Sequence, residues 1–540
     1  MTKIINATDF GIIPGAEAAE KLYLLMRELA GTEGEKQLNF QKGIYYIDAD
    51  KLPQKSMFIT NTVGDNEWKR GEEPHLNRAG ILMENISDLV IEGGGARFIL
   101  RGRACNAVIR NCRNITLKDV SFDSENPDMH ELTVIRRGAF YIDYAVDKYS
   151  NLKKDGGEWC FSGKDYTVPV TLGRPAGWIG KVTAGDENRI VRVNHPLTGA
   201  FGISMPRNGV LRAYYVVPPR YKQGDVFCLF DVRRKYNGIF IDESENIRLS
   251  GVEQNFNYGL AVVCQCSKDV SITGCKFIPR VRYMASVADF VQVCSCRGKV
   301  EICGNTFTGS GDDCLNVHGI HFKAVSANGN RMKVAFGHRQ THGFNPFKKG
   351  DVLRVIGKNT LLEEGRLTVE SARLSDEYSI ELTLRENADG IVGKVVENAS
   401  ACPDVDFCDN VVDRVITRGV LATTAGKVRI AGNRFLHTSM HAVLISDDAK
   451  SWYESGMVRD VEISGNYFGA CRGYTLMVKP ENSVPGFVHE NVRFTGNTID
   501  SGGQGGFYLK DCRGVVISGN KIIGKTKKGK FIRADYSMDK

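Results

Sequence analysis

The chain has 540 residues, of which 42% are hydrophobic and 25% are charged, and its formal net charge at pH 7 is +8. This composition is typical of a globular protein with room for several domains, and it argues against a disordered chain. A basic cluster at residues 525–530 has no aromatic-rich basic face beside it, so no nucleic-acid partner is expected. The sequence contains no apolar run of about 18 residues, so no membrane span is expected.

One convincing helix is predicted near the N-terminus. Residues 16–29 place Leu22, Leu25 and Met26 on one face, between a short opening phrase at 8–11 and a strand pattern at 43–48. We expect this helix to cap the stack of strands that follows, because an uncapped end would expose a sheet edge and apolar core.

Internal repeats decide the predicted architecture. The phrase apolar-x-apolar-x-Gly-Asn-x-apolar begins at Val300, Val428, Val461, Val492 and Val515, with weaker copies at Leu89, Ile115, Ile247 and Val270. Copies without an insertion between them lie 23 to 33 residues apart. Strand alternation at such a period is typical of a parallel β-helix. We expect each Gly-Asn to form a left-handed turn and the Asn side chains to stack as a ladder.

Two intervals between repeats are far too long for one coil. They separate Ile115 from Ile247 and Val300 from Val428, and each leaves room for an insertion of about 100 residues. Both insertions contain strand-like runs and predict small antiparallel barrels. The predicted fold is all-β: a right-handed parallel β-helix with an N-terminal capping helix and two inserted β-barrel domains. The predicted boundaries are 1–124 for the cap and first coils, 125–240 for barrel 1, 241–319 for coils with candidate acids, 320–404 for barrel 2, and 405–540 for the last coils and tail.

Fifteen cysteines form none of the CxxC pairs expected of a zinc site. Many recur at matching places in successive repeats, and we interpret these mostly as small apolar core residues, with disulfides for a minority.

Three acids mark the candidate site. Asp312 and Asp313 follow a Gly-Ser-Gly turn and lead into an alternating strand, and Asp289 begins a matching phrase one coil earlier. Alignment of the coils by their central strands predicts one column of residues: Gly259, Asp289, Asp313, His441 and Tyr474. Neighbouring coils stand about 4.8 Å apart, so the three acids should meet. Their repulsion should leave one protonated, and we expect that one to be Asp312.

Other uses of these residues compete with catalysis. A lone acid in such a turn is more often solvated or capping, but three acids in adjacent coils favour a function. Calcium binding is the competing function; we expect no metal and no cofactor. The candidate substrate-binding residues are His318, His441, Lys479 and Tyr474, although Lys479 fits a surface lysine equally well.

The arrangement resembles two families of β-helical glycoside hydrolases. In the family 28 polygalacturonases, which are pectin-lyase-like β-helices, an upstream Asp, an Asp-Asp-Cys phrase, a His and an Arg-x-Lys strand end form the site. The three acids, His441 and Lys479 occupy those places here. Met477 replaces the arginine that pairs with the uronate, which argues against an acidic sugar.

The second family is similar over nearly the whole chain. The phrase at 311–319, the 23 residues from Asp289 to Asp312, the opening at 8–11 and the two insertions resemble the bacterial α-1,3-galactosidases of family 110. The resemblance implies exo-hydrolysis of terminal α-1,3-linked galactose with inversion, on blood-group B or linear α-galactosyl glycans. Asp312 would be the general acid, with Asp289 and Asp313 as the base pair, in agreement with our reading of the residues. The alternatives are a pectinase-like enzyme acting on uronates and a non-catalytic carbohydrate-binding β-helix.

The expected partner is an oligosaccharide or glycan with a terminal galactose. The flat sides of a β-helix and the barrels offer surfaces for a homodimer. By the same resemblance we expect the protein in the bacterial periplasm, at the cell surface or secreted, with an export signal absent from this chain.

Overall fold

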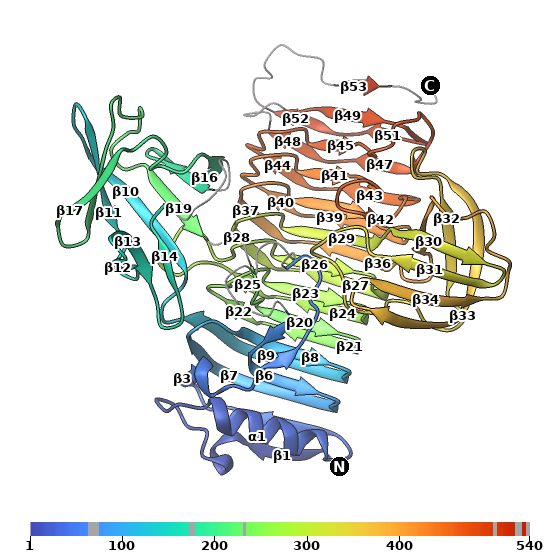
Figure 1. Cartoon of the computed structure of the whole chain (residues 1–540), viewed down its shortest axis with the longest axis horizontal. Helices are drawn as coiled ribbons and strands as arrows, with labels where there is room; N and C mark the ends of the chain where they lie inside the picture. Colours follow the sequence, from blue (N-terminus) through green and yellow to red (C-terminus); the bar gives the residue numbers. More distant parts are fainter. Residues whose placement is uncertain are drawn as a thin grey trace.

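The computed structural model describes residues 2–62, 75–171, 179–230, 234–500 and 505–523, and the backbone of 532–535. The basic cluster at 525–530 lies outside these residues. Figure 1 shows a long stack of short strands with one inserted unit on each side. The predicted helix forms as α1 (Ala19–Ala30), buries Leu22, Leu25, Met26 and Leu29, and lies at the N-terminal end of the stack (Figure 1).

The stack is a parallel β-helix, as the repeats predict. Two long parallel sheets form its walls. The 21-stranded sheet contains β1 (Lys3–Asn6), β2 (Lys36–Asn39), β3 (Gly43–Asp48), β7 (Ser87–Arg101), β9 (Arg113–Ser124), β21 (Glu245–Ser250), β22 (Glu253–Gln254), β24 (Lys268–Thr273), β25 (Lys276–Phe277), β27 (Arg297–Cys303), β28 (Thr306–Ser310), β36 (Asp404–Cys408), β37 (Val411–Val415), β39 (Lys427–Ala431), β40 (Arg434–Phe435), β43 (Asp460–Ser464), β44 (Tyr467–Gly469), β47 (Val492–Thr495), β48 (Thr498–Asp500), β51 (Val516–Ser518) and β52 (Lys521–Ile523).

A second sheet of 12 strands carries the candidate site. In spatial order from one end it contains β6 (Ala79–Glu84), β8 (Cys105–Arg110), β20 (Ile239–Asp242), β23 (Val262–Gln265), β26 (Val291–Cys294), β29 (Leu315–Ile320), β38 (Val420–Thr423), β41 (Val443–Ile445), β45 (Leu476–Val478), β49 (Phe507–Lys510) and β53 (Ile532–Asp535), with β42 (Glu454–Ser455) antiparallel to β29. None of the described helices is long and apolar enough to cross a membrane.

The Gly-Asn repeats form the predicted ladder. The glycines take left-handed φ values, such as 69° at Gly304 and 63° at Gly465, which cost glycine little. Each asparagine amide donates to the Oδ1 of the asparagine in the next coil at 2.9 to 3.1 Å, through the series Asn305, Asn410, Asn433, Asn466, Asn497 and Asn520. These bonds satisfy side-chain groups that would otherwise be buried unpaired.

The cysteines behave as the repeats suggest. Twelve of the thirteen free cysteines are buried. One disulfide joins Cys303 to Cys408, which are directly paired residues of β27 and β36. Most cysteines are therefore core residues, and a minority is cross-linked.

Among its described residues, the first insertion forms an open sheet and not a closed barrel. Its main sheet has seven strands, in the order β16 (Asp186–Val193), β15 (Ile179–Thr183), β19 (Val226–Phe230), β10 (Met129–Arg137), β11 (Tyr141–Val146), β18 (Val210–Tyr214) and β17 (Gly202–Arg207). A smaller sheet has β12 (Asn151–Asp155), β13 (Glu158–Ser162) and β14 (Thr167–Pro169).

The edge strand β16 of the first insertion lies against the β-helix. Arg189 donates to the carbonyl oxygen of Ala470 at 2.8 Å, and the Ser439 hydroxyl donates to that of Ile190. Strand β16 is thus held by the β-helix rather than by β17. The sequence predicted two barrels, and the structure closes one.

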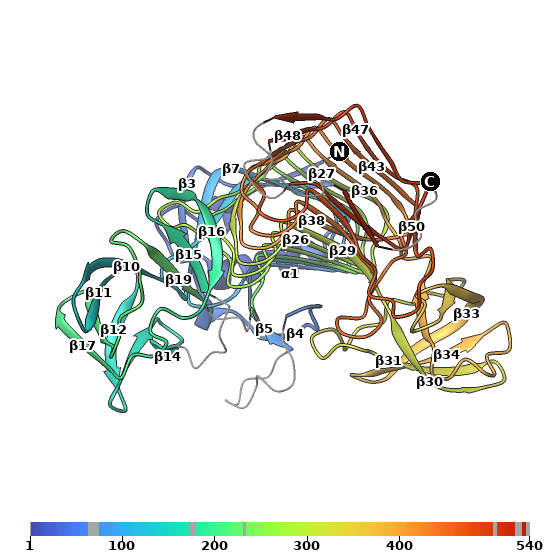
Figure 2. The same ribbon diagram turned by 90° about the horizontal axis from the view of Figure 1, so that it is seen from above.

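The second insertion is the closed barrel. Its six strands are β30 (Phe322–Asn328), β31 (Arg331–Ala335), β34 (Ser379–Leu384), β33 (Glu363–Asp376), β32 (Val352–Ile356) and β35 (Val395–Asn398). Seen along the stack, the first insertion projects toward the lower left of the β-helix and the second toward the lower right, so the two stand apart (Figure 2).

Candidate active site

The three predicted acids line one cavity of about 360 Å³. Strand register explains their meeting, because Val291 pairs with Leu315 and Leu315 pairs with Val420. Asp289 and Asp313 each stand two residues before these positions, in adjacent coils, as predicted. The residue in the preceding coil is Leu260 rather than Gly259, because β23 pairs from Val262 onwards.

The Gly-Ser-Gly turn allows the acids to approach. A Cβ atom on Gly309 would lie 2.3 Å from the Tyr283 carbonyl oxygen, and one on Gly311 would lie 2.1 Å from that of Val287. Side chains at these positions would push the coils apart. One oxygen from each of Asp289, Asp312 and Asp313 lies within 4.8 Å of the others.

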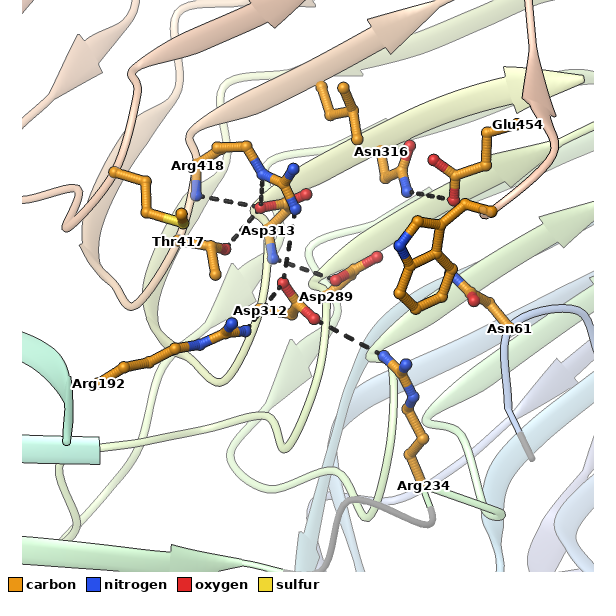
Figure 3. Close-up of a pocket in the computed structure, with 13 residues that line it drawn as sticks. Asn61, Arg192, Arg234, Asp289, Asp312, Asp313, Asn316, Thr417, Arg418 and Glu454 are labelled. Carbon is orange, nitrogen blue, oxygen red and sulfur yellow. Dashed lines mark hydrogen bonds and ion pairs between the residues drawn. The ribbon is translucent and has the colours of Figure 1, made fainter. Parts of the chain in front are cut away.

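Asp313 is fixed by three hydrogen bonds to its Oδ1. The donors are Thr417 Oγ1 at 2.5 Å, the Arg418 backbone N–H at 3.0 Å and Arg418 Nε at 2.8 Å. The backbone N–H of Asp313 in turn donates to Asp289 Oδ1 at 3.0 Å. These contacts hold two carboxyl groups side by side (Figure 3).

Burial and mutual repulsion govern the protonation of the two inner acids. Burial, then the negative charges of Asp312 and Asp313, raise the pKa of Asp289 well above its ordinary value. Burial also raises the pKa of Asp313, against the opposing effect of Arg418. Both inner carboxyl groups therefore hold a proton more readily than an exposed carboxyl group does.

Asp312 is surrounded by cations instead. Guanidinium nitrogens of Arg192, Arg234 and Arg418 lie 3.5, 3.8 and 3.9 Å from its oxygens. Repulsion among the three acids is the basis of the predicted proton on Asp312. The charges of these arginines are a further influence on Asp312, which repulsion among the acids does not include.

The four predicted substrate-binding residues are not among those that line the cavity. His441 occupies the acid column two coils after Asp313 and accepts a hydrogen bond from the Tyr474 N–H at 3.1 Å. Burial, with Arg418 and Lys479 nearby, lowers the pKa of His441 to about 4. The ring of Tyr474 stacks on that of His441 at 5.6 Å.

His318 and Lys479 are engaged with protein groups. The imidazole of His318 is buried, with Gln292 at 2.9 Å and the Gly319 carbonyl oxygen at 2.8 Å. Lys479 forms an ion pair with Glu481 at 2.7 Å on the surface. The cavity is lined instead by Asn61, Arg192, Arg234, Asn316, Thr417, Arg418, Leu421, Met440, Trp452 and Glu454 beside the three acids.

The three acids could also supply ligands to a cation. One oxygen of Asp313 is already occupied by Arg418, and three guanidinium groups surround Asp312. A cation would therefore meet positive charge on one side of the cluster. The absence of a catalytic metal stays a prediction.

Comparisons with known proteins agree with the sequence-based resemblance. The family model "GLAA-B beta-barrel domain II" matches residues 331–394, and "Right handed beta helix region" matches residues 390–537. Alpha-1,3-galactosidase A of Bacteroides thetaiotaomicron is 28% identical over 96% of this chain and 89% of its own length. Alpha-1,3-galactosidase B of the same organism is 26% identical over 97% and 87%. A family 28 exopolygalacturonase from Yersinia enterocolitica aligns with 100% of this chain and 77% of its own, at 11% identity and a TM-score of 0.34.

The fold, the acid cluster and the sequence relatives together support a glycoside hydrolase. Within that class, the resemblance to the bacterial α-1,3-galactosidases is confirmed by curated relatives of that name, at 26–29% identity over most of the chain.

Proposed function

We propose that the protein is an exo-acting α-1,3-galactosidase that inverts the anomeric configuration. The observation that carries the proposal is the cluster of three carboxyl groups in the cavity of a chain whose relatives bear that name. The expected substrates are blood-group B or linear α-galactosyl glycans.

The catalytic roles follow from exposure and hydrogen bonding. Asp312 is the most exposed of the three acids, with 17% of its side chain accessible, so it is our general acid at the glycosidic oxygen. Asp289 and Asp313 are held side by side and together bind the attacking water as base. In this assignment Asp312 carries the proton that it donates, and Asp289 and Asp313 must be ionised to activate the water, although burial raises the pKa of both.

The stereochemical proposal has a structural rival. Inverting enzymes usually separate their two carboxyl groups by about 6.5–9.5 Å and retaining enzymes by about 5–5.5 Å. Oxygens of the three acids lie within 4.8 Å of one another, and this short separation favours a nucleophilic carboxylate and a retaining mechanism. The pairing of Asp289 with Asp313 favours a water held by both carboxylates and an inverting mechanism. Proton NMR of the first-formed galactose decides between them. The β anomer supports inversion, and the α anomer overturns it.

The activity is tested on galactose-α-1,3-galactose and on p-nitrophenyl α-galactoside, with and without EDTA. We expect hydrolysis of both, unaffected by the chelator.

Asp312→Asn should lower the rate of hydrolysis of the disaccharide by about 10²–10⁴-fold, and should lower it less for an aryl galactoside whose leaving group needs little protonation. If Asp289→Asn shows that leaving-group dependence instead, Asp289 is the acid.

The rival substrate class is a uronate. Arg192, Arg234 and Arg418 could pair with its carboxylate, but all three already lie within 3.9 Å of Asp312. Release of reducing sugar from polygalacturonate, with none from α-galactosides, would replace the proposal. Binding of galactosides without any hydrolysis would indicate the non-catalytic alternative.

Cellular location and assembly stay predictions. We propose a periplasmic or surface location and a homodimer through the β-helix or inserted units. Fractionation of the native host and light scattering of the purified protein test these two points.

A further inference from the structure

One segment outside the repeats forms part of the cavity wall. The segment 447–455 leaves the stack after β41 and returns along β29, where Ser455 pairs with Gly319. It carries two cavity residues, Trp452 and Glu454. Neither has a role in the acid chemistry described above.

The base of the segment 447–455 is locked by buried polar contacts. His321 and Asp447 are completely buried and joined at 2.7 Å. The carboxylate of Asp448 accepts the backbone N–H groups of Lys450, Ser451 and Trp452 at 2.6 to 3.1 Å. Such contacts fix the backbone that carries Trp452 before any ligand arrives.

The second insertion supports the tip of the segment. The imidazole of His338 packs against the Trp452 indole, with ring centroids 4.4 Å apart. The ring of Tyr453 fills the space beside Gly337, where a Cβ atom would lie 2.1 Å from it. Trp452 nevertheless remains 40% exposed. Among the described residues that line the cavity, it is the only aromatic one.

Polar groups accompany the indole. Glu454 accepts a hydrogen bond from Asn316 at 3.2 Å. The Oδ1 atoms of Asn61 and Asn316 are buried and accept no hydrogen bond from the part of the chain that the structure describes. Figure 3 shows Asn61, Asn316 and Glu454 on one side of the acids, with Arg192 on the other.

This combination of groups fits the shape of galactose. Its axial 4-hydroxyl leaves the C–H groups of C3, C4 and C5 as an apolar patch on one face of the ring. An indole buries such a patch, and carboxylate and amide groups bind the hydroxyls at its edge. Glucose has an equatorial 4-hydroxyl, so it would leave polar groups of the wall unpaired.

We propose that Trp452 and Glu454 are the specificity-determining residues of the cavity. Trp452 is the platform for the apolar face of galactose, and Glu454, with Asn61 and Asn316, binds its hydroxyls. The inference rests on the proposed function, because it takes the galactosyl unit beside the acids as the ligand.

The test measures binding separately from hydrolysis. The chain has four tryptophans, so intrinsic fluorescence reports on Trp452 against a constant background. Titration with D-galactose should change the emission saturably in the wild type and in the control Trp159→Phe, which alters β13 of the first insertion. Trp452→Phe should abolish the change, and D-glucose should produce none in any variant.

Kinetics provide the second measurement. Trp452→Ala should raise KM for p-nitrophenyl α-galactoside about tenfold, and Trp452→Phe should restore much of the loss. Glu454→Gln should weaken galactose binding by a similar factor. Thermal melting identifies any variant that fails to fold. If Trp452→Ala fails to fold, the kinetics of Trp452→Phe and Glu454→Gln provide the test.

Two results would overturn the inference: a wild-type emission that does not respond to galactose, or a Trp452→Phe titration equal to that of the wild type. A galactose response without hydrolysis of any α-galactoside would leave the sugar platform standing and remove the proposed activity.

Discussion

The two insertions flank the same acids and serve them in different ways. The first is an open sheet whose edge strand β16 lies on the β-helix and brings Arg192 to 3.5 Å from Asp312. The second is a closed barrel whose His338 and Gly337 support the segment 447–455. The edge strand of an open sheet can place a charge directly beside a candidate catalytic group, whereas a closed barrel acts through the residues that pack against it.

The largest effect is expected from the open sheet. Arg192→Ala should lower kcat/KM on α-galactosides by about tenfold, the equivalent of roughly 1.4 kcal/mol. A cation beside the acids favours their ionised forms, so its loss should also move the acidic limb of the pH profile to higher pH. Arg192→Lys should restore part of both.

The matched control is Arg207→Ala, which removes an exposed arginine from the opposite edge strand β17. It should leave the pH profile unchanged. A profile unaffected by Arg192→Ala would remove the first insertion from the electrostatics of the site.

A smaller effect, on KM, is expected from the barrel. Gly337→Ala places a methyl group in the space of the Tyr453 ring and should displace Trp452. We expect KM to rise by about threefold to tenfold with little change in kcat, because the acids are untouched. Gly365→Ala is the control, since a Cβ atom there meets nothing within 4 Å. Equal kinetics for the two variants would show that the barrel does not support the site.

The smallest effect concerns stability. The pKa of Asp289 is raised in the folded protein, so ionisation of its carboxyl destabilises the fold as pH rises above the unfolded value of about 4. Asp289→Asn removes this penalty and can still accept the Asp313 N–H. Its melting temperature at pH 7 should exceed that of the wild type by about 1–3 °C.

The gain should shrink toward pH 4, where the wild-type carboxyl is protonated. A variant less stable than the wild type at pH 7 would show that the cluster is not strained by charge. That result would mean that Arg234 and Arg418 offset the repulsion of Asp289 by Asp312 and Asp313.

The periodic part of the molecule could be predicted from the sequence. The Gly-Asn phrase predicts the coil spacing and five members of the ladder, Asn305, Asn433, Asn466, Asn497 and Asn520, and the spacing places Asp289 next to Asp313. The sixth member, Asn410, follows Asp409 rather than a glycine. The same count would have found Arg418, which stands two residues before Val420. The coil of Arg418 follows a long insertion and lacks the Gly-Asn phrase, so it is not among the predicted repeats.

The aperiodic part could not be predicted. Arg192 comes from an insertion, and Trp452 and Glu454 come from a segment between two coils. Their positions depend on tertiary packing, such as the contact between His338 and Trp452, for which a sequence repeat holds no signal. Closure of the first insertion likewise depended on tertiary packing, because its edge strand β16 packs against the β-helix instead of pairing with β17.

The Cys303–Cys408 disulfide has a consequence for the assembly of the site. It closes a loop with a sequence separation of 105 residues, and Asp313 and Arg418 are separated by the same number. In the chain-entropy model, a cross-link over a loop of about 100 residues removes about 4.7 kcal/mol of unfolded-state freedom. The disulfide thus holds the two ends of the second insertion together in adjacent coils. The contact between Asp313 and Arg418 should therefore tolerate insertions or deletions within the barrel.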